Sequence, residues 1–428
     1  MNFKIAILYH FCLVRFNRMR FHFDKTKWHQ YYWKSFVKTL NQSPYYQQIA
    51  PQHLEDLSFM QKIQKQEFME NFDRINTACI SKEEAFSVAT LAEKSRNFNP
   101  EINKITIGLS SGTSGNRGVF MANQNERALW VATILDRAIG FSFKKRNVAF
   151  FLRANSNLYE SAKSKLLNFQ FFDLLIPVKN QVDRLNDLNP QILIGQPSLL
   201  LELAVFQNSG KLKIKPEKII SVAEVLEAND KVLLEKTFDQ IIHQVYQCTE
   251  GLLASTCING TLHFHEDYLQ IDKIYLDKDR FYPIITDFVR KTQPIVRYEL
   301  NDIIIEKKNC GCGNTFLAIE QIEGRSDDIL NFINDQNEPV SIYPDFFRRA
   351  IILSDETIYD YMLVQKSAKI LEIYLGNKEI QLQEKVKKHL NELLRSYHIS
   401  NVEFVFSDER NIVPGEKLRR IKNGIKAN

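Results

Sequence analysis

Cysteine is scarce in this chain, and the features that it lacks exclude several classes of protein. Six cysteines occur in 428 residues, and no small-residue cleavage site follows the apolar stretch from Ile5 to Val14. We therefore expect neither secretion nor a disulfide framework. The same stretch contains His10 and is too short to cross a bilayer. The expectation is a cytoplasmic protein without a transmembrane segment.

The chain also lacks a strong charge of one sign. Its formal net charge is +5 for 50.1 kDa, and no basic run interleaved with aromatic residues is present, so nucleic acid is not an expected partner. Arg15, Arg18 and Arg20 follow the first apolar stretch. We interpret residues 5–14 as a helix packed on the body of the protein, and peripheral membrane contact by this helix is the alternative.

The length of the chain exceeds what one hydrophobic core normally supports, so at least two domains are expected. No internal repeat or low-complexity linker is visible. Continuous apolar runs, typical of strands buried on both faces of a sheet, occur at residues 148–152, 192–194, 219–222 and 241–246. We predict an α/β fold in which a large N-terminal domain, residues 1–325, has mixed sheets flanked by helices.

The pattern changes after residue 325. Two strands are predicted at 359–364 and 370–375, an amphipathic helix at 380–394 and a third strand at 402–406. These elements predict a small α+β domain over residues 326–428, which would act as a mobile lid.

A run of glycines and hydroxyl residues follows a short apolar strand within residues 106–119. Hydroxyl groups can donate to a phosphate there, and glycines let backbone N–H groups approach an anionic oxygen. The residues of this run are Ser110, Ser111, Gly112, Thr113, Ser114, Gly115 and Gly118. A helix is predicted at 123–139, so the run lies between a strand and a helix, as phosphate-binding loops do. The run lacks the Gly-Lys-Ser/Thr ending of a Walker loop, and an ordinary turn is the alternative.

Three later segments add chemistry suited to a nucleotide. Tyr246, Thr249 and Glu250 offer an aromatic face, a hydroxyl and a carboxylate, which can stack on a base, hold a phosphate oxygen and bind Mg²⁺. Asp302 ends a predicted strand segment and can accept both hydroxyls of a ribose. Arg325 follows a glycine and precedes two carboxylates.

With these segments in this order, the chain resembles the adenylate-forming enzymes of the acyl-CoA synthetase superfamily, on the phenylacetate-CoA ligase branch. It is most similar there to proteins related to the synthetase that adenylates a deazaflavin coenzyme. The likeness extends over nearly the whole chain, including residues 43–46, 54–57, 195–198 and 221–224.

The resemblance implies a role for each motif residue. Residues 110–115 would hold the triphosphate of ATP, Ala223 and Glu224 would border the adenine, and Tyr246 would stack on it. Thr249 would contact the α-phosphate, Glu250 would bind Mg²⁺, and Asp302 would bind the ribose. Arg325 would contact the nucleotide, and Asp327 would be the hinge. Structural alternatives are a solvated ion pair for Asp302 and Arg325, and a helix-start acid for Glu224.

The resemblance also implies a lysine near the end of the chain that bridges the carboxylate and the α-phosphate. Lys417 is the candidate, because a cation there would offset charge as two anions approach each other. Glu416 precedes it, where related enzymes often have glycine, so Lys422 is a substitute candidate. A solvated basic tail is the structural alternative.

The cysteines form a second group. Cys310 and Cys312 can present two thiolates to one metal, and Cys257 precedes His263 by six residues. Three sulfurs and one imidazole complete a tetrahedral Zn²⁺ shell, which would be structural because it is closed. His265 competes with His263 for this role, and reduced buried thiols are the alternative.

The expected function is ATP-dependent adenylation of a carboxylic acid with release of pyrophosphate. The acyl group would then pass to a thiol, most simply coenzyme A, or an acyl carrier protein in its place. The branch favours aromatic acids, and the Phe-rich region at 150–172 can line a pocket or fill a core. The alternatives are AMP transfer to a hydroxyl or phenol, and a nucleotide-binding partner protein without turnover.

Overall fold

The structure is a computed structural model, and it describes residues 2–21, 24–49, 57, 60–95, 99–110, 117–140, 142–152, 166–355, 357–410 and 418–425. The chain divides into two compact units. Unit 1 consists of Met1–Leu300 and Ile305–Gln321, and unit 2 consists of Asn301–Ile304 and Ile322–Asn428. The domain boundary predicted after Arg325 stays a prediction.

Unit 1 contains a parallel sheet that is built from the apolar runs of the sequence. Its strands lie in the order β8-β7-β6-β4-β5, and neighbours in this order are parallel. Their bounds are β4 (Arg146–Leu152), β5 (Leu167–Asp173), β6 (Ile192–Gly195), β7 (Lys218–Val222) and β8 (Ile242–Gln247). β4, β6 and β7 are mostly apolar and largely buried, as is typical of α/β sheets with both faces covered, whereas β5 and β8 also contain polar residues and are partly exposed.

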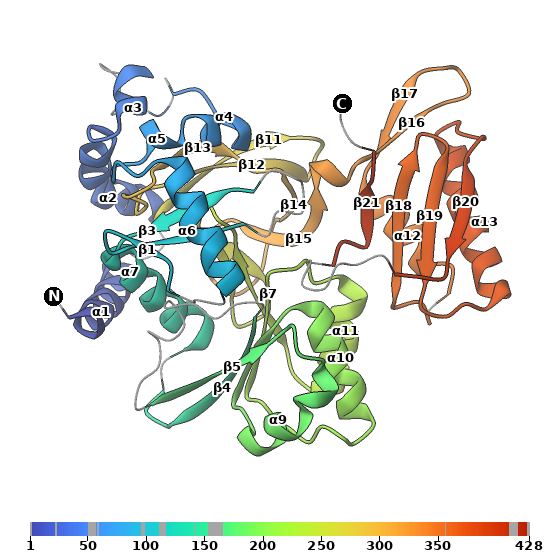
Figure 1. Ribbon diagram of the computed structural model, residues 1–428, viewed down its shortest axis with the longest axis horizontal. Coiled ribbons are helices and arrows are strands. Elements are labelled where there is room, and N and C mark those ends of the chain that lie inside the picture. Colours follow the sequence, from blue (N-terminus) through green and yellow to red (C-terminus); the bar gives the residue numbers. More distant parts are fainter. Residues whose placement is uncertain are drawn as a thin grey trace. The chain divides into compact units, whose positions relative to one another are not determined.

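Three helices cover one face of this parallel sheet (Figure 1). They are α9 (Val182–Leu188), α10 (Pro197–Asn208) and α11 (Ala228–Phe238). Leu185, Leu200, Leu203 and Leu234 from these helices are fully buried in one core with Phe151. Because all five strands are parallel, their carboxyl ends meet at one edge of the sheet, where α/β proteins commonly bind ligands.

The sheet becomes mixed beyond β8. β9 (Leu252–Thr256) is antiparallel to β8, and the whole sheet has twelve strands. The other strands are β10 (Leu262–Phe264), β11 (Leu269–Tyr275), β12 (Arg280–Asp287), β13 (Ile295–Glu299), β14 (Asp302–Lys307) and β15 (Ala318–Arg325). A separate three-stranded sheet contains β1 (Glu101–Ile102), β2 (Ile105–Leu109) and β3 (Val119–Ala122).

Helices dominate the N-terminal part of unit 1. They are α1 (Phe3–Phe21), α2 (Lys25–Leu40), α3 (Pro44–Ile49), α4 (Lys65–Glu70), α5 (Phe72–Ile75), α6 (Lys82–Ser95) and α7 (Gln124–Ile134). The helix predicted at 123–139 begins with a capping box formed by Asn123 and Glu126, and its last turn, Leu135–Ile139, is a π-helix. Within the described residues, no helix is long and apolar enough to cross a membrane.

Unit 2 is the small α+β body that the sequence pattern indicates. Its four-stranded sheet has the order β20-β19-β18-β21, and a two-stranded sheet pairs β16 with β17. The elements are β16 (Leu330–Ile333), β17 (Pro339–Ile342), α12 (Pro344–Ile352), β18 (Tyr361–Ser367), β19 (Ile370–Leu375), α13 (Ile380–Ser396), β20 (Glu403–Ser407) and β21 (Ile421–Asn423). The apolar side of α13 packs with β18 and β19 in one core. The predicted α/β class, with a large mixed-sheet body and a small α+β body, is confirmed.

Candidate active site

The predicted phosphate-binding run begins and ends at two residues that are bonded to each other. Ser110 N–H donates to the Gly118 carbonyl (2.8 Å), and Gly118 N–H donates to Ser110 Oγ (2.7 Å). Arg117 Nε also donates to the Ser110 carbonyl (3.0 Å). Ser111, Gly112, Thr113, Ser114 and Gly115 lie outside the described residues. Ser110 and Gly118, which lie in the described part, are therefore joined by two hydrogen bonds, and we call this pair the closed neck.

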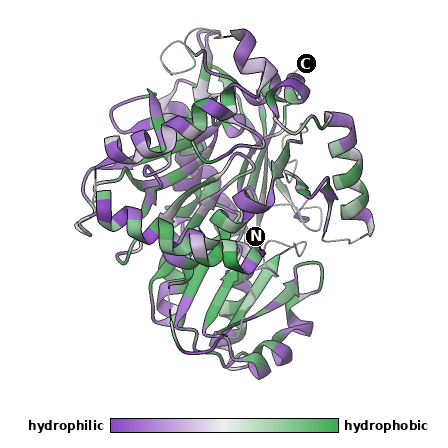
Figure 2. Ribbon diagram, turned by 90° about the vertical axis from the view of Figure 1, so that its left-hand side faces the viewer, coloured by the Kyte–Doolittle hydropathy of each residue, from purple (hydrophilic) through white to green (hydrophobic). Residues whose placement is uncertain are grey.

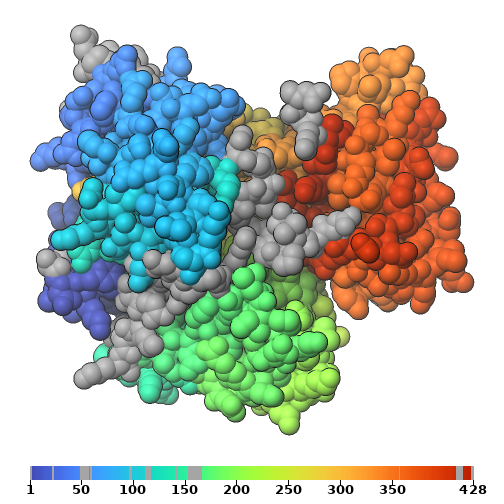
Figure 3. Space-filling view, viewed as in Figure 1, coloured from blue at the N-terminus to red at the C-terminus, as the bar shows by residue number. Residues whose placement is uncertain are grey.

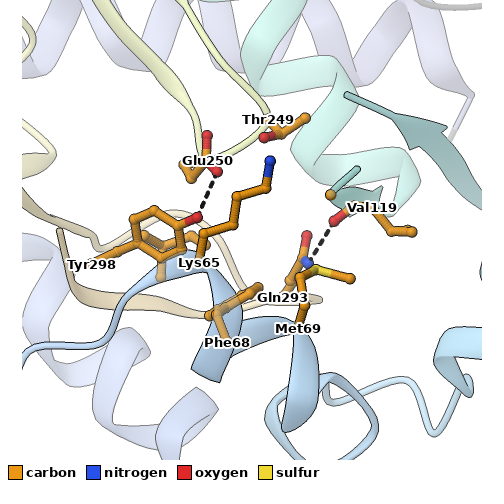
Figure 4. Close-up of a pocket in the computed structure, with 10 residues that line it drawn as sticks. Lys65, Phe68, Met69, Val119, Thr249, Glu250, Gln293 and Tyr298 are labelled. Carbon is orange, nitrogen blue, oxygen red and sulfur yellow. Dashed lines mark hydrogen bonds between the residues drawn. The ribbon is translucent and has the colours of Figure 1, made fainter. Parts of the chain in front are cut away.

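A pocket in unit 1 brings three reactive groups to this neck. Lys65, Thr249 and Glu250 line it together with Tyr298 (Figure 4). A Cβ atom at Gly118 would lie 3.5 Å from Lys65 Cε, 3.8 Å from Ser110 Oγ and 3.9 Å from Thr249 Oγ1. An ammonium and two hydroxyls thus converge on one backbone position. A larger residue at 118 would fill the space between them.

Glu250 is held by a tyrosine of a neighbouring strand. The Tyr298 hydroxyl donates to Glu250 Oε1 (2.9 Å), as the dashed line in Figure 4 marks. This bond orients the carboxylate and leaves its second oxygen available for a cation. The main chain at Thr249 is fixed by Arg290, whose Nη1 donates to the Thr249 carbonyl (3.3 Å).

Lys65 was not among the predicted site residues, and it lies far from most of the other pocket residues in the chain. Ile63 pairs with β13 in the structure: Ile63 N–H donates to the Arg297 carbonyl (3.0 Å), and Glu299 N–H donates to the Ile63 carbonyl (2.9 Å). This pairing places the first residue of α4 next to Tyr298. No local pattern in the sequence signals a contact of this kind.

The predicted adenine-binding residues follow two neighbouring parallel strands. Ala223 comes directly after β7 with φ of 70°, and Glu224 N–H donates to the Val222 carbonyl (2.9 Å), which closes a three-residue turn. A non-glycine residue in this conformation is strained, as is common where backbone contacts a ligand. Tyr246 lies near the end of β8, the strand beside β7.

Glu224 has a structural partner. Its Oε2 accepts a hydrogen bond from Ser198 N–H (3.3 Å) in the first turn of α10. This is the helix-start role that the sequence analysis named as the alternative, since a carboxylate stabilises the positive end of a helix.

A buried carboxyl lies behind the Thr249–Glu250 turn. A Cβ atom at Gly251 would be 3.0 Å from Asp287 Oδ2, so glycine makes room for this group. Burial raises the pKa of Asp287 to about 7, against the opposing charge of Arg290. Asp287 also accepts from Val289 N–H (2.9 Å).

Asp302 and Arg325, which we predicted in the N-terminal domain, lie with Asp327 in unit 2. Asp302 and Arg325 form an ion pair (3.5 Å), and Asn301 Nδ2 donates to Asp327 Oδ2 (2.9 Å). Arg419 Nε donates to Asp328 Oδ2 (3.1 Å).

The two lysine candidates at the end of the chain differ in what the structure shows. Lys417 lies outside the described residues. Lys422 belongs to β21, which pairs with β18 in parallel, and its register partner is Val364. Its backbone is therefore fixed in a sheet of unit 2.

Four predicted metal ligands lie together in unit 1. Their ligand atoms, from Cys257, His263, Cys310 and Cys312, are all within 4.8 Å of one another. Cys257 Sγ is 3.5 Å from Cys310 Sγ, and Cys312 Sγ is 3.4 Å from His263 Nε2. A tetrahedral zinc ion separates such ligand atoms by about 3.5–3.8 Å. The two distances above are close to this value, so the chemistry and the grouping of the four side chains fit the ion.

The structure distinguishes His263 from His265. His263 Nδ1 lies 2.9 Å from the Phe316 carbonyl, so this nitrogen carries the proton and Nε2 faces the sulfurs as an acceptor. His265 is fully buried elsewhere, where its Nε2 meets Ser255 Oγ (2.9 Å). Burial acts to raise the pKa of Cys310, but hydrogen bonds from neighbouring groups, with Thr261 first among them, outweigh it and lower this pKa to about 6.

Comparison with known proteins supports the fold and, over a short stretch, a sequence relationship. No protein-family model matches the chain. A 2-hydroxyisobutyryl-CoA ligase in the postadenylation state, with 2-HIB-AMP, superposes with a TM-score of 0.65 at 16% identity, over 91% of this chain and 89% of that one. The fold is that of the adenylate-forming acyl-CoA ligases.

Two further comparisons are consistent with this fold. A benzoate CoA ligase from Burkholderia xenovorans LB400 superposes with a TM-score of 0.53 at 14% identity, over 73% of this chain and 67% of that one. An indoleacetate–lysine synthetase of Pseudomonas savastanoi is 27% identical over 134 residues, or 30% of this chain. That match spans about a third of the synthetase, 33% of its length.

The Phe-rich region fills a core in the described part of this adenylate-forming fold. Phe151 of β4 and Phe172 of β5 are fully buried, and their rings stack with centroids 4.7 Å apart. Residues 153–165 lie outside the described part. Of the two interpretations offered above, these two residues favour the core.

Proposed function

We propose that this protein is an ATP-dependent ligase that adenylates a carboxylic acid. The observation that carries the proposal is the convergence of Lys65, Thr249 and Glu250 on the closed neck at Gly118. A cation, a hydroxyl donor and a carboxylate at one point are the groups needed to bind a triphosphate with its metal. The adenylate-forming fold supports this assignment, because it is the fold of ligases whose structures contain acyl-AMP.

The proposed reaction is a displacement at the α-phosphorus of ATP. One carboxylate oxygen of the acid forms a bond to the α-phosphorus, and the bond from that phosphorus to the bridging oxygen of the β-phosphate breaks. Pyrophosphate leaves with the electron pair, and acyl-AMP remains. Thr249 donates to the α-phosphate, and Lys65 offsets the negative charge that grows on the departing pyrophosphate. Mg²⁺, when held by the free oxygen of Glu250, supplies further positive charge at the phosphates.

The residues of unit 2 complete the proposal. Asp302 binds the ribose, Arg325 contacts the nucleotide, and Lys417 bridges carboxylate and α-phosphate, as in the phenylacetate-CoA ligase branch that the sequence resembles. A rotation about Asp327 then exposes the acyl-AMP to its acceptor. The acid that we infer is aromatic, and the acceptor that we infer is the thiol of coenzyme A.

An amine is the second candidate acceptor. The name of the Pseudomonas savastanoi relative states that it joins indoleacetate to lysine, and its matching segment is 27% identical to this chain. The adenylation step would be the same for either acceptor. The second step would also be similar, since the thiol or the amine would attack the acyl carbon and release AMP.

We also propose that Cys257, His263, Cys310 and Cys312 hold a structural zinc ion. The four ligand atoms leave no open position for substrate, so the ion would join the loop after β9 to the loop after β14. The Nδ1 contact of His263 with Phe316 orients the ring for binding.

Pyrophosphate release tests the proposal. Purified protein is incubated with ATP, Mg²⁺ and a panel of aryl and fatty acids, alone and with coenzyme A, lysine or a phenol. Release with an acid alone, raised by coenzyme A, is the expected result, and stimulation by lysine instead would identify the amine acceptor. Release that requires the phenol, with no acid, would show AMP transfer, and no release with any acid would contradict the proposal.

A pair of lysine variants tests the pocket itself. Lys65→Ala is expected to lower the rate of pyrophosphate release about 100-fold, the typical effect of losing one donor to developing charge. Lys62→Ala is the matched control, because Lys62 lies three residues earlier and pairs with Glu299 (3.0 Å) outside the pocket. Equal rates for both variants would mean that Lys65 does not act on ATP.

A further inference from the structure

The first helix of unit 1 has two apolar faces. One face packs on α7, where Ala6 and Ile7 contact Ala128 and Val131 in a small core. His10 Nε2 also meets Asn125 Oδ1 (2.8 Å). These contacts hold α1 along its length against the body of unit 1, so its opposite face must point outward.

The outward face is apolar from one end of the helix to the other. Ile5, Leu8, Tyr9, Phe16 and Met19 each leave between 55% and 74% of their surface exposed. At 100° per residue these five positions lie within about 60° of one line along the helix. Isolated exposed apolar residues are common, but a continuous row of five on one helix marks an interaction surface.

This outward face of α1, defined by those five residues, lies at the surface of unit 1. Figure 3 shows α1 there in the darkest blue, and Figure 2 views the molecule from the side of the N-terminal helices.

The charge around this face is strongly positive. Residues 1–40 contain eight lysines and arginines and one acidic residue, Asp24. Their formal charge of +7 exceeds the +5 of the whole chain, so the remainder is slightly acidic. Arg15 lies beside the face and Arg18 farther round the helix; both are nearly half exposed and pair with the buried carboxylate of Asp136. Lys25 of α2 pairs with Glu266, so Arg20 is the basic residue of the last turn of α1 that we use to test the role of charge.

We propose that the outward face of α1 docks on a membrane surface that contains anionic lipids. A helix that lies in the interface buries an apolar row among the acyl chains and keeps basic residues at the headgroups. Exposed tyrosine and phenylalanine on the same row suit this boundary. Each basic residue near an anionic surface adds about 1 kcal/mol of attraction. A protein partner would explain the apolar row but gives no reason for the excess of basic residues in residues 1–40, the segment that carries it.

Vesicle sedimentation with the full chain tests the proposal. Vesicles of phosphatidylcholine alone are compared with vesicles that also contain phosphatidylglycerol. We expect the protein to sediment with the mixed vesicles, to bind the neutral ones far less, and to be released by salt. Replacing Leu8, Phe16 and Met19 together by serine should lower binding to the mixed vesicles at least tenfold. Arg20→Gln should lower it about fivefold, the equivalent of about 1 kcal/mol.

The matched control replaces three other exposed apolar residues of unit 1. Leu91, Val205 and Val232 are 64–66% exposed on α6, α10 and α11, and their triple serine variant should bind vesicles like the original chain. Both triple variants should keep the thermal unfolding and the pyrophosphate release of the original chain, which excludes misfolding. Failure to bind mixed vesicles, or equal loss in both triple variants, would overturn the proposal. If the original chain is a dimer that does not bind vesicles, and the triple variant of Leu8, Phe16 and Met19 is a monomer, a second copy covers this face and the proposal is wrong.

Discussion

Replacing Cys312 by serine removes one of the four ligand atoms that we propose for zinc. The proposed ligands come from segments that are distant in the sequence, since Cys257 and Cys310 are 53 residues apart. A cross-link that closes a loop of about 50 residues lowers the entropy of the unfolded chain by the equivalent of about 4 kcal/mol. A zinc ion held by these side chains would link the same chain segments in the folded state. Loss of the ion should therefore lower the free energy of unfolding by a similar amount. For a unit of this size we expect Tm to fall by roughly 5–10 °C.

Metal analysis and thermal unfolding of the same preparations provide the assay. Protein prepared without chelator should contain about one zinc ion per chain, and Cys312→Ser should lose both the ion and the stability. Cys79→Ser is the matched control, because Cys79 is exposed and lies outside the metal cluster. Chelator should lower the Tm of the control as in the original chain and leave that of Cys312→Ser unchanged. A zinc-free original chain, or a Cys312→Ser variant with an unaltered Tm, would refute the reasoning.

Three other outcomes are expected. Glu250→Gln should lower pyrophosphate release by orders of magnitude while circular dichroism shows an intact fold, since the amide binds Mg²⁺ poorly; an unchanged rate would contradict the metal assignment. Lys417→Ala should abolish acyl-AMP formation yet permit transfer from acyl-AMP supplied ready-made, and an inactive Lys422→Ala beside an active Lys417→Ala would reverse the assignment. Burial raises the pKa of Asp287 to about 7, so the folded state binds more protons than the unfolded state between about pH 4 and 7 and stability falls as pH rises through this window. Asp287→Asn should therefore increase the free energy of unfolding more at about pH 8 than at about pH 4, and an equal effect at both would mean that this carboxyl is not buried.

Local patterns predicted several elements of the two bodies. The apolar runs at 192–194 and 219–222 became β6 and β7, because strands buried on both faces need apolar residues throughout. The helix predicted at 380–394 became α13, whose spacing places Leu382, Val386 and Leu390 on one side. Patterns of this kind are local, so one sequence suffices to see them.

The parts of the site that depend on distant pairings were not predictable. Lys65 reaches the pocket only because Ile63 pairs with β13, and no motif surrounds it. The choice between His263 and His265 was open for a similar reason. Both fit the spacing, and only the contacts of each ring with Phe316 or Ser255 separate them. The grouping of Cys257, Cys310 and Cys312 with one of these two histidines was predictable from residue type and spacing.

The pairing of Ile63 with β13 has a consequence for shortened forms of this chain. β13 carries Tyr298, which orients Glu250, and it also fixes the start of α4, which presents Lys65. A fragment that begins after Ile63 would keep the later motifs, from the glycine run to Arg325, and would look complete by inspection. It would still lack the segment that positions the cation beside the phosphates, so a search or a cloning strategy guided by motifs alone would select an inactive piece. Supplying residues 1–64 as a separate peptide should restore activity only if its helices pack on the fragment and this β-bridge forms between the two chains.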